Sequence, residues 1–317
     1  MLCISNHITD PYFNIASEEF LLRNFSDDIF MLYINEPSII IGKHQNAFAE
    51  INHRFVADNN IKVIRRLSGG GTVFHDAGNL NFCFIRNGKD GNLIDFKRFT
   101  QPILEVLHKL GVPAERSGRN DLIINGLKFS GNAEHVYKNR TLHHGTLLFT
   151  SGLDNLRAAL KVNANQYEDK AVKSVRSSVT NISEHLSSKI NVQEFAEIIT
   201  NHVINKESDV TSYKFSDSDT SSINELVTNK YSTWDWNFGY SPKFIYRNQG
   251  TIGSNQIEIE LLIEKGIIIS ADIKINNKVN HSLIQAITNI RYRADEIKAR
   301  TQSSNNGDLI NITSLLF

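Results

Sequence analysis

The chain has 317 residues and a mass of 35.9 kDa, and its 40% hydrophobic and 21% charged residues are typical of a folded globular protein. Lysine plus arginine and aspartate plus glutamate number 34 each, so the net charge of zero excludes a protein that works mainly by unspecific attraction to nucleic acid or acidic lipid. Two cysteines, Cys3 and Cys83, are too few for a disulfide framework or a four-ligand zinc site and indicate a reducing compartment. The N-terminus carries no targeting signal, and every apolar run is far shorter than the about 20 residues that span a bilayer, so we expect a cytoplasmic protein without membrane spans.

Apolar periodicity and turn residues predict the elements in chain order. In the first part we expect helices at 14–25 (capped by Asn14), 48–59 and 98–110, and strands at 29–34, 38–41, 61–65, 79–85, 121–130 (a hairpin) and 141–149. Helices at 192–204 and 222–230, two paired strands at 256–263 and 266–275, and a helix at 283–290 follow. The last three elements form a small α+β unit, so we place a domain boundary near Tyr246, between 1–245 and 246–317.

The most unusual stretch is RRLSGGGTVFHD, residues 65–76. Three successive glycines cost about 0.5–1 kcal/mol each in backbone entropy, relative to alanine in regular structure, so something should compensate. Such a turn lets backbone N–H groups converge on an anion, and the guanidinium groups of Arg65 and Arg66 grip phosphate or carboxylate. The stretch therefore predicts an anion site, without naming the anion. A plain glycine-rich turn beside a solvated arginine pair is the alternative.

The dipeptide Asn125-Gly126 is a strong hairpin signal and sets a register. In that register Leu122, Ile124, Leu127 and Phe129 share an apolar core face, and Asp121, Ile123, Lys128 and Ser130 share the other face. Asp121 and Lys128 are then diagonal neighbours within reach of each other. They form either an exposed ion pair of little energetic value or a lysine and an acid presented to a ligand.

Together with three more segments, these stretches resemble the lipoate–protein ligase family. The matching segments, in the order expected for the family, are RRLSGGGTVFHDAGNLNF (65–82), SGRNDLIINGLKFSGNA (117–133), HHGTLLF (143–149), SVRSSVTN (174–181) and WDWNFGYSPKF (234–244). The resemblance implies an α+β fold of the biotin/lipoate ligase type, with mixed sheets and flanking helices. It also implies that residues 1–245 are a catalytic domain for lipoate and ATP and that residues 246–317 are a small α+β accessory domain.

The activity implied by the resemblance has two steps. Lipoate and ATP, with Mg²⁺, form lipoyl-AMP and pyrophosphate, and a lysine of an acceptor protein then takes the lipoyl group and releases AMP. The implied acceptors are the lipoyl domains of 2-oxoacid dehydrogenase E2 subunits and the H protein of glycine cleavage. We expect a monomer that binds neither nucleic acid nor membrane.

The resemblance also implies roles for individual residues. By position Lys128 matches the catalytic lysine of the family, which contacts the lipoate carboxylate and the adenylate, and Asp121 matches the acidic residue near the phosphates and is the expected Mg²⁺ ligand. The implied binding residues lie in the glycine stretch, in the hairpin and in a segment that closes over the adenylate: Arg65, Arg66, Ser68, Gly70, Gly71, Thr72, Val73, Phe74, Asp121, Lys128, Ser130, Ser174, Val175, Ser178 and Thr180.

Two alternatives remain at this point. An octanoyl or lipoyl transferase of the same fold needs a cysteine nucleophile downstream of the lysine, whereas Cys3 and Cys83 both precede Lys128. A non-catalytic binder of lipoyl-adenylate would have no need of Lys128, Asp121 and Arg66 together.

No residue is indicated as the base that deprotonates the acceptor lysine. His75, His143 and His144 are candidates by residue type alone, and a buried, hydrogen-bonded histidine is the simpler interpretation of each.

Overall fold

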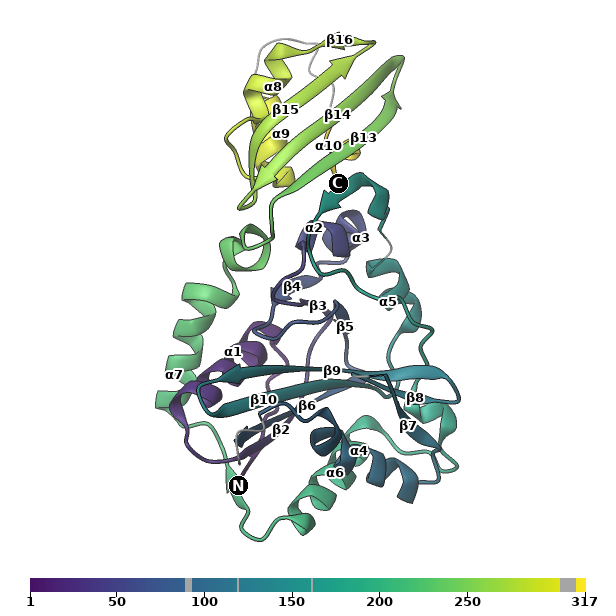
Figure 1. The fold of residues 1–317 in the computed structure, drawn as a ribbon, viewed down its shortest axis with the longest axis vertical. Helices are drawn as coiled ribbons and strands as arrows, with labels where there is room; N and C mark the ends of the chain where they lie inside the picture. The colour runs from purple at the N-terminus through teal and green to yellow at the C-terminus, as the bar shows by residue number, and fades with distance from the viewer. Residues whose placement is uncertain (89–92, 119, 161, 303–311) are drawn as a thin grey trace. The chain divides into compact units, whose positions relative to one another are not determined.

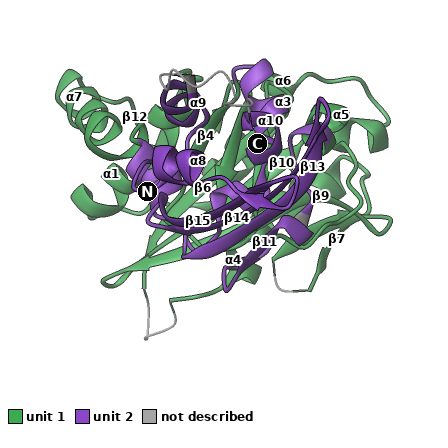
Figure 2. Ribbon diagram, turned by 90° about the horizontal axis from the view of Figure 1, so that it is seen from above, with its two compact units in different colours: residues 1–43, 61–157, 174–233 green, residues 44–60, 158–173, 234–317 purple. Residues whose placement is uncertain are grey.

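The computed structural model describes residues 1–88, 93–118, 120–160, 162–302 and 312–317 (Figure 1). It shows a mixed α+β protein, as the sequence predicts. The described chain divides into two compact units that alternate along the sequence (Figure 2). The first consists of residues 1–43, 61–157 and 174–233, and the second of residues 44–60, 158–173 and 234–317.

An eight-stranded sheet forms the framework of the first unit. Its order is β12-β1-β2-β6-β10-β9-β8-β7, and β1 runs parallel to both of its neighbours. The strands are β1 (Leu2–Ser5), β2 (Ile29–Ile34), β6 (Asn79–Asn87), β7 (Ala114–Ser117), β8 (Asp121–Ile124), β9 (Leu127–Tyr137), β10 (Arg140–Leu148) and β12 (Thr211–Tyr213). The predicted strands at 29–34, 79–85 and 141–149 are confirmed.

One face of this sheet packs against helices α4 (Phe96–Lys109) and α6 (Val192–Lys206). Phe30, Phe82 and Phe84 of the sheet meet Phe99 and Phe195 of the helices in this core, and all five are at most 5% exposed. The alternating pattern of the strands predicts such a buried face. The other face, which carries the intervening side chains, is therefore the one left to hold a site.

Helix α1 (Pro11–Asn24) covers part of this other face and contacts β4, β6 and β10. It begins at Pro11, and the side chain of Asp10 accepts a hydrogen bond from the amide of Phe13. The predicted cap Asn14 is therefore wrong, because it lies one turn inside the helix, fully buried. The remaining helices of the first unit's described part are α7 (Asp217–Leu226), its π-helical extension η3 (Val227–Tyr231), the short η2 (Ile182–His185) and most of α5 (Leu153–Ala159).

A small sheet in the order β4-β3-β5 completes the first unit. It comprises β3 (Ser38–Ile41), β4 (Lys62–Arg65) and β5 (Val73–His75), with β3 parallel to β4 and antiparallel to β5. Ile39, Ile40 and Ile41 of the central strand are at most 1% exposed. The sheet thus holds both ends of the stretch 66–72, which connects β4 to β5.

The second unit is built on an antiparallel sheet in the order β11-β13-β14-β15-β16. Its elements are β11 (Tyr167–Asp169), β13 (Phe244–Ile252), β14 (Asn255–Glu264), β15 (Ile267–Ile275), β16 (Lys278–Val279), α2 (Ala47–Glu50), α3 (His53–Asp58), η1 (Ala164–Gln166), η4 (Asp235–Gly239), α8 (His281–Ile287), α9 (Ala294–Gln302) and α10 (Thr313–Leu316). The predicted pair of strands at 256–263 and 266–275 is confirmed. The predicted helix at 48–59 is wrong, because Asn52 caps a new helix and divides it in two.

Phe48 of α2 belongs to the apolar core of this second unit. Residues 44–60 and 158–173 thus belong to the same compact unit as the C-terminal residues. The assignment of 1–245 to a catalytic domain and 246–317 to an accessory domain stays a prediction. Across the described residues no helix has both the length and the apolar character that a membrane crossing requires.

Candidate functional site

The hairpin of β8 and β9 turns at Asn125 and Gly126, whose φ values of 51° and 80° are those the dipeptide predicts. The two residue pairs next to the turn are also as predicted, so Lys128 lies opposite Ile123. Since opposite residues share a face, this register confirms that Lys128 stands on the same face as Ile123.

Beyond these pairs the predicted register is wrong. Phe129 is an extra residue in a β-bulge, so Leu122 lies opposite Ser130 and Asp121 lies opposite Gly131. Ser130 therefore shares the buried face with Leu122 and is only 1% exposed. A bulge cannot be read from an alternating pattern, because the pattern assumes that no residue is inserted.

Lys128 and Asp121 are in contact, as predicted, with 2.9 Å between Nζ and Oδ1. Their side chains are 25% and 33% exposed, so both remain open to a ligand from solvent. The end of the lysine side chain lies over Gly131, where a Cβ atom would come within 3.2 Å of Cε and Nζ. Glycine at this position leaves room for the ammonium group above the strand.

Residues 68–72, which form most of the connection between β4 and β5, are called the glycine bend below. Gly70 has φ of 86°, which favours glycine. The backbone N–H groups of residues 69–71 donate to no partner among the described residues. Unpaired N–H groups in such a bend are suited to donate hydrogen bonds to an anion.

Arg66 holds the carbonyl groups of the glycine bend. Its guanidinium donates from Nη2 to the carbonyl oxygens of Gly69 (2.6 Å) and Gly71 (2.7 Å). In a trans peptide the C=O and the following N–H point in opposite directions, so the amides of Gly70 and Thr72 point away from Arg66. The guanidinium is 4% exposed, and burial lowers the pKa of Arg66 to about 10, well above neutral pH.

Strand β9 brings the glycine bend and Lys128 to one face of the large sheet. A Cβ atom at Gly70 would lie 3.9 Å from the Cβ of Ala133, and the lysine ammonium lies over Gly131. Positions 131 and 133 alternate along the strand and point to the same side. The ammonium group and the unpaired amides therefore occupy the same side of the sheet.

A third segment, residues 174–180, joins the other two and is called the covering segment below. Ser178 O accepts from the amide of Lys128 (2.9 Å), and the amide of Thr180 donates to Lys128 O (3.0 Å). At its other end Ser174 Oγ accepts from the amide of Thr72 (2.9 Å). The structure thus brings together all three sequence segments in which the candidate residues lie.

Not every candidate side chain points toward this site. Arg65 is fully buried and donates to the carbonyl oxygens of residues 42 and 43, and Phe74 is 2% exposed in β5. The Thr180 hydroxyl lies 2.9 Å from His185 Nε2, whereas Val175 is 87% exposed and Val73 is partly buried. A direct ligand contact for each of these residues stays a prediction.

The three histidines are buried and hydrogen-bonded, as the simpler interpretation expects. Burial lowers the pKa of His75 to about 3 and that of His143 well below its usual value. His144 lies within hydrogen-bond distance of both Ser68 and Glu18, and Glu18 is not among the site residues that the sequence predicts. No local signal pairs Glu18 with His144, because 126 residues separate them.

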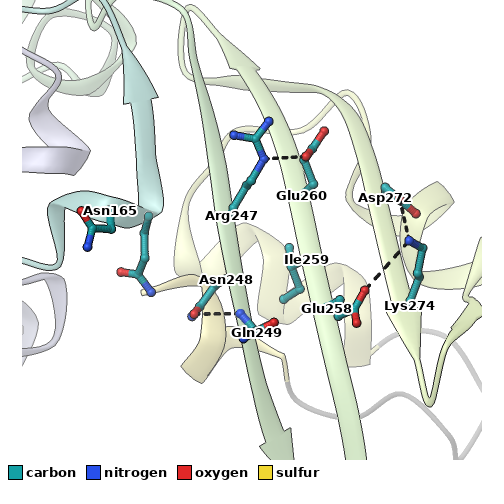
Figure 3. A pocket seen from close by; sticks show the side chains of 10 residues that line it. Asn165, Arg247, Asn248, Gln249, Glu258, Ile259, Glu260, Asp272 and Lys274 are labelled. Carbon is teal, nitrogen blue, oxygen red and sulfur yellow. Dashed lines mark hydrogen bonds and ion pairs between the residues drawn. The ribbon is translucent and has the colours of Figure 1, made fainter.

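The described residues contain no group of three or more histidine, cysteine, aspartate or glutamate side chains that could hold a metal ion. A concave polar surface does exist in the second unit, on the face of β13, β14 and β15 (Figure 3). There Arg247 pairs with Glu260, and Lys274 lies between Glu258 and Asp272. These charges compensate each other at the surface, and none of the candidate residues lines it.

Comparisons with known proteins agree on one family. A family profile described as the lipoyl protein ligase A/B catalytic domain matches residues 10–204. The chain is 44% identical over 273 residues to lipoate-protein ligase LplJ of Bacillus subtilis, which covers 84% of this chain and 82% of that protein. It is 42% identical over 271 residues to lipoate–protein ligase 1 of Staphylococcus aureus, covering 85% and 82%.

Solved structures give the same result. A putative lipoate protein ligase of Thermoplasma acidophilum with bound lipoic acid superimposes with a TM-score of 0.65 at 25% identity, covering 74% of this chain and 98% of that one. The archaeal bipartite ligase studied with its E2 lipoyl domain gives 0.63 at 25% identity, covering 75% and 96%. A lipoate-protein ligase A bound with ATP gives 0.62 at 25% identity, covering 76% and 100%.

Proposed function

Because this chain belongs to the lipoate–protein ligase family, we propose that the glycine bend, Lys128 and the covering segment form the site where lipoate reacts with ATP. The protein is an enzyme that attaches lipoate to protein at the expense of ATP, as its relatives are named. The observation that carries the proposal is the position of the Lys128 ammonium and the unpaired amides of residues 69–71 on one side of β9.

In the first step the lipoate carboxylate attacks the α-phosphorus of ATP. A carboxylate oxygen–phosphorus bond forms, the bond from the α-phosphorus to the bridging oxygen breaks, and pyrophosphate leaves. The two reacting groups are both anionic, so their approach needs a positive charge between them. The ammonium group of Lys128 supplies it, and the amides of the glycine bend donate to the phosphate oxygens.

Mg²⁺ accompanies ATP in this proposal and would neutralise charge on the phosphates. Proteins commonly hold Mg²⁺ through one or two carboxylates plus substrate phosphates, so a dedicated cluster of ligands is not required. Asp121 fits such a role, because its carboxylate is 33% exposed and lies 2.9 Å from Lys128 Nζ. It would hold the ion and orient the ammonium group.

In the second step the amine of an acceptor lysine attacks the acyl carbon of lipoyl-AMP. The amide bond forms, the bond to the phosphate oxygen breaks, and AMP leaves. One archaeal neighbour is described together with its E2 lipoyl domain, which supports lipoyl domains as acceptors. We extend the proposal to the H protein of glycine cleavage and to a monomeric enzyme of the cytoplasm.

The transferase alternative requires a reactive thiolate. Cys3 and Cys83 are both buried, and burial raises the pKa of each thiol, that of Cys83 well above its usual value. A thiol with a raised pKa is a poor nucleophile at neutral pH. The geometry therefore favours the ligase over a transferase that acts through a thioester.

Two assays test the proposal together. Lipoate-dependent exchange of labelled pyrophosphate into ATP reports the first step, and mass spectrometry of an E2 lipoyl domain incubated with lipoate, ATP and enzyme reports the second. A ligase gives both signals. A transferase or a non-catalytic binder gives no exchange, and that result would refute the proposal.

A further inference from the structure

Four side chains form a continuous buried chain of hydrogen bonds behind the glycine bend. Glu18 Oε2 lies 2.7 Å from His144 Nδ1, and His144 Nε2 lies 2.6 Å from Ser68 Oγ. Ser68 Oγ accepts from Arg66 Nε at 2.9 Å. Ser68 is 1%, Glu18 2%, Arg66 4% and His144 8% exposed, so solvent does not compete for these bonds. We call this chain the relay.

Donor and acceptor chemistry determines the direction of the two outer bonds in the relay. Arg66 can only donate, so Ser68 Oγ accepts there, and the Glu18 carboxylate accepts the hydrogen of His144 Nδ1. We assign the hydrogen of the central bond to the Ser68 hydroxyl, which donates it to His144 Nε2. The second oxygen of Glu18 accepts from the Tyr33 hydroxyl at 2.9 Å. The carboxylate is thus the final acceptor of a chain that begins at the guanidinium.

Arg66 connects the relay to the carbonyl groups of the glycine bend. Its Nε is held by Ser68, its Nη1 donates to the carbonyl of Ile40 (3.0 Å), and its Nη2 holds the carbonyls of Gly69 and Gly71. If the peptide between residues 69 and 70 flipped, a carbonyl oxygen would replace the Gly70 N–H in the site. That oxygen would repel a phosphate.

We propose that Glu18 and His144 are positioning residues for adenylate formation: through Ser68 they orient Arg66, which keeps the amides of the glycine bend turned toward the substrate phosphates. The expected effect on the reaction with ATP rests on the proposed function. The expected effect on the conformation of the glycine bend rests on the contacts alone. Neither residue needs to touch a substrate for this role.

The neighbouring histidine provides a matched control. His143 is also buried, and its Nδ1 lies 2.9 Å from the carboxylate of Glu134, much as His144 meets Glu18. It points to the opposite face of β10, however, where its ring stacks on Phe99 with centroids 4.8 Å apart. The pair of Glu134 and His143 has the chemistry of the relay but lies on the face of β10 that packs against α4.

Two substitutions disturb the hydrogen bonds of the relay with little change in the shape of the side chains. Glu18→Gln is almost isosteric but removes the negative charge and replaces one of the two acceptor oxygens by an NH2 donor, so His144 and Tyr33 can no longer both donate to this side chain. Ser68→Ala removes one oxygen atom and interrupts the relay. His143→Gln serves as the control for the loss of a buried histidine.

Amide hydrogen exchange tests the structural consequence without any dependence on activity. The amides to follow are those of Lys43, which donates to Ser68 O (2.8 Å), and Thr72, which donates to Ser174 Oγ (2.9 Å). Relative to the slowest core amides of β6, both should exchange at least about 10-fold faster in Glu18→Gln and Ser68→Ala. In His143→Gln they should stay within about 2-fold of the parent protein.

Lipoate-dependent pyrophosphate exchange tests the kinetic consequence. A merely structural role would reduce the folded fraction and hence kcat, leaving KM for ATP unchanged. A positioning role raises KM for ATP by about 10-fold or more, which is the range for groups that orient a binding residue. The KM for ATP of the double variant Ser68→Ala with Glu18→Gln should exceed that of the more strongly affected single variant by less than about 3-fold. The two effects should not add, because both substitutions disturb the same relay.

The outcomes are distinguishable. If Lys43 and Thr72 exchange as in the parent protein, or if His143→Gln accelerates them equally, the inference is overturned. An unchanged KM for ATP in both relay variants overturns it too. If the parent enzyme shows no lipoate-dependent exchange, the proposed function fails, and the amide measurements decide the inference by themselves.

Discussion

Replacing Lys128 by methionine should abolish adenylate formation while the protein stays folded. The change keeps most of the side-chain volume and removes the ammonium group that lies over Gly131. Loss of one group that stabilises transition-state charge costs about 2.7–4 kcal/mol in comparable sites, or 10²–10³-fold in kcat. We therefore expect lipoate-dependent pyrophosphate exchange to fall at least about 100-fold.

The same substitution should change stability only slightly. The ion pair of Lys128 with Asp121 is a quarter to a third exposed, and such pairs contribute about 0–1 kcal/mol after solvent screening. A loss of about 1 kcal/mol corresponds to roughly 2–4 °C in Tm for a unit of this size. The effect on activity should therefore be far greater than the effect on folding.

Lys62→Met is the matched control for this prediction. Lys62 lies in the same unit, is 33% exposed and forms ion pairs with Asp10 (2.7 Å) and Glu36 (2.5 Å), neither of which belongs to the glycine bend or the covering segment. Its pyrophosphate exchange should stay within about 3-fold of the parent enzyme. Near-normal exchange in Lys128→Met, measured on protein with an unchanged circular dichroism spectrum, would remove Lys128 from the mechanism.

Three further predictions concern Gly131, the two cysteines and His75. Gly131→Ala should lower pyrophosphate exchange at least about 10-fold with little change in Tm, because the new Cβ would lie 3.2 Å from Lys128 Nζ. An unaffected rate would show that the ammonium group does not need this space. N-ethylmaleimide should not inactivate the enzyme, because Cys3 and Cys83 are buried and burial raises the pKa of both thiols. Inactivation that lipoate prevents would instead favour a reaction through a cysteine thioester. Burial lowers the pKa of His75 to about 3, so as pH falls below about 6.5 the unfolded chain binds a proton that the folded chain does not, and stability falls. The Tm should therefore decrease between pH 7.5 and pH 5, by less in His75→Gln, and an equal pH dependence of the two proteins would contradict this account.

The contact between Lys128 and Asp121 could be predicted because a short-range signal sets it. Asn125-Gly126 determines the turn, and the two pairs beside the turn follow from it. The bulge at Phe129 could not be predicted, since an alternating pattern assumes that no residue is inserted. Its consequence is the reversal of Ser130 to the buried face.

The relay behind the glycine bend could not be predicted from the sequence, for a different reason. His144 and Ser68 are 76 residues apart, and Glu18 lies on helix α1, which begins at Pro11 and not at the predicted cap Asn14. Only the packing of α1 against β10 brings the carboxylate to the histidine. The sequence predicts that the arginines of the glycine stretch bind a ligand, whereas Arg66 donates hydrogen bonds to the carbonyl oxygens of the bend itself.

The contribution of early residues to the second unit was equally hidden. Phe48 packs with Phe244 and Tyr292, with ring centroids 5.5 and 5.1 Å apart, although nearly 200 residues or more separate it from either. Its local sequence indicates only an amphipathic helix. Pairing across such distances follows from complementary apolar surfaces, and single-sequence patterns do not encode it.

A crystal structure of the enzyme with a non-hydrolysable lipoyl-AMP analogue tests the central claim most directly. The account predicts that Lys128 Nζ lies within hydrogen-bond distance of the acyl-phosphate linkage, with the amides of residues 69–71 donating to the phosphate. An analogue that binds elsewhere, for example on the sheet surface of Figure 3, with Lys128 still facing only Asp121, would contradict it.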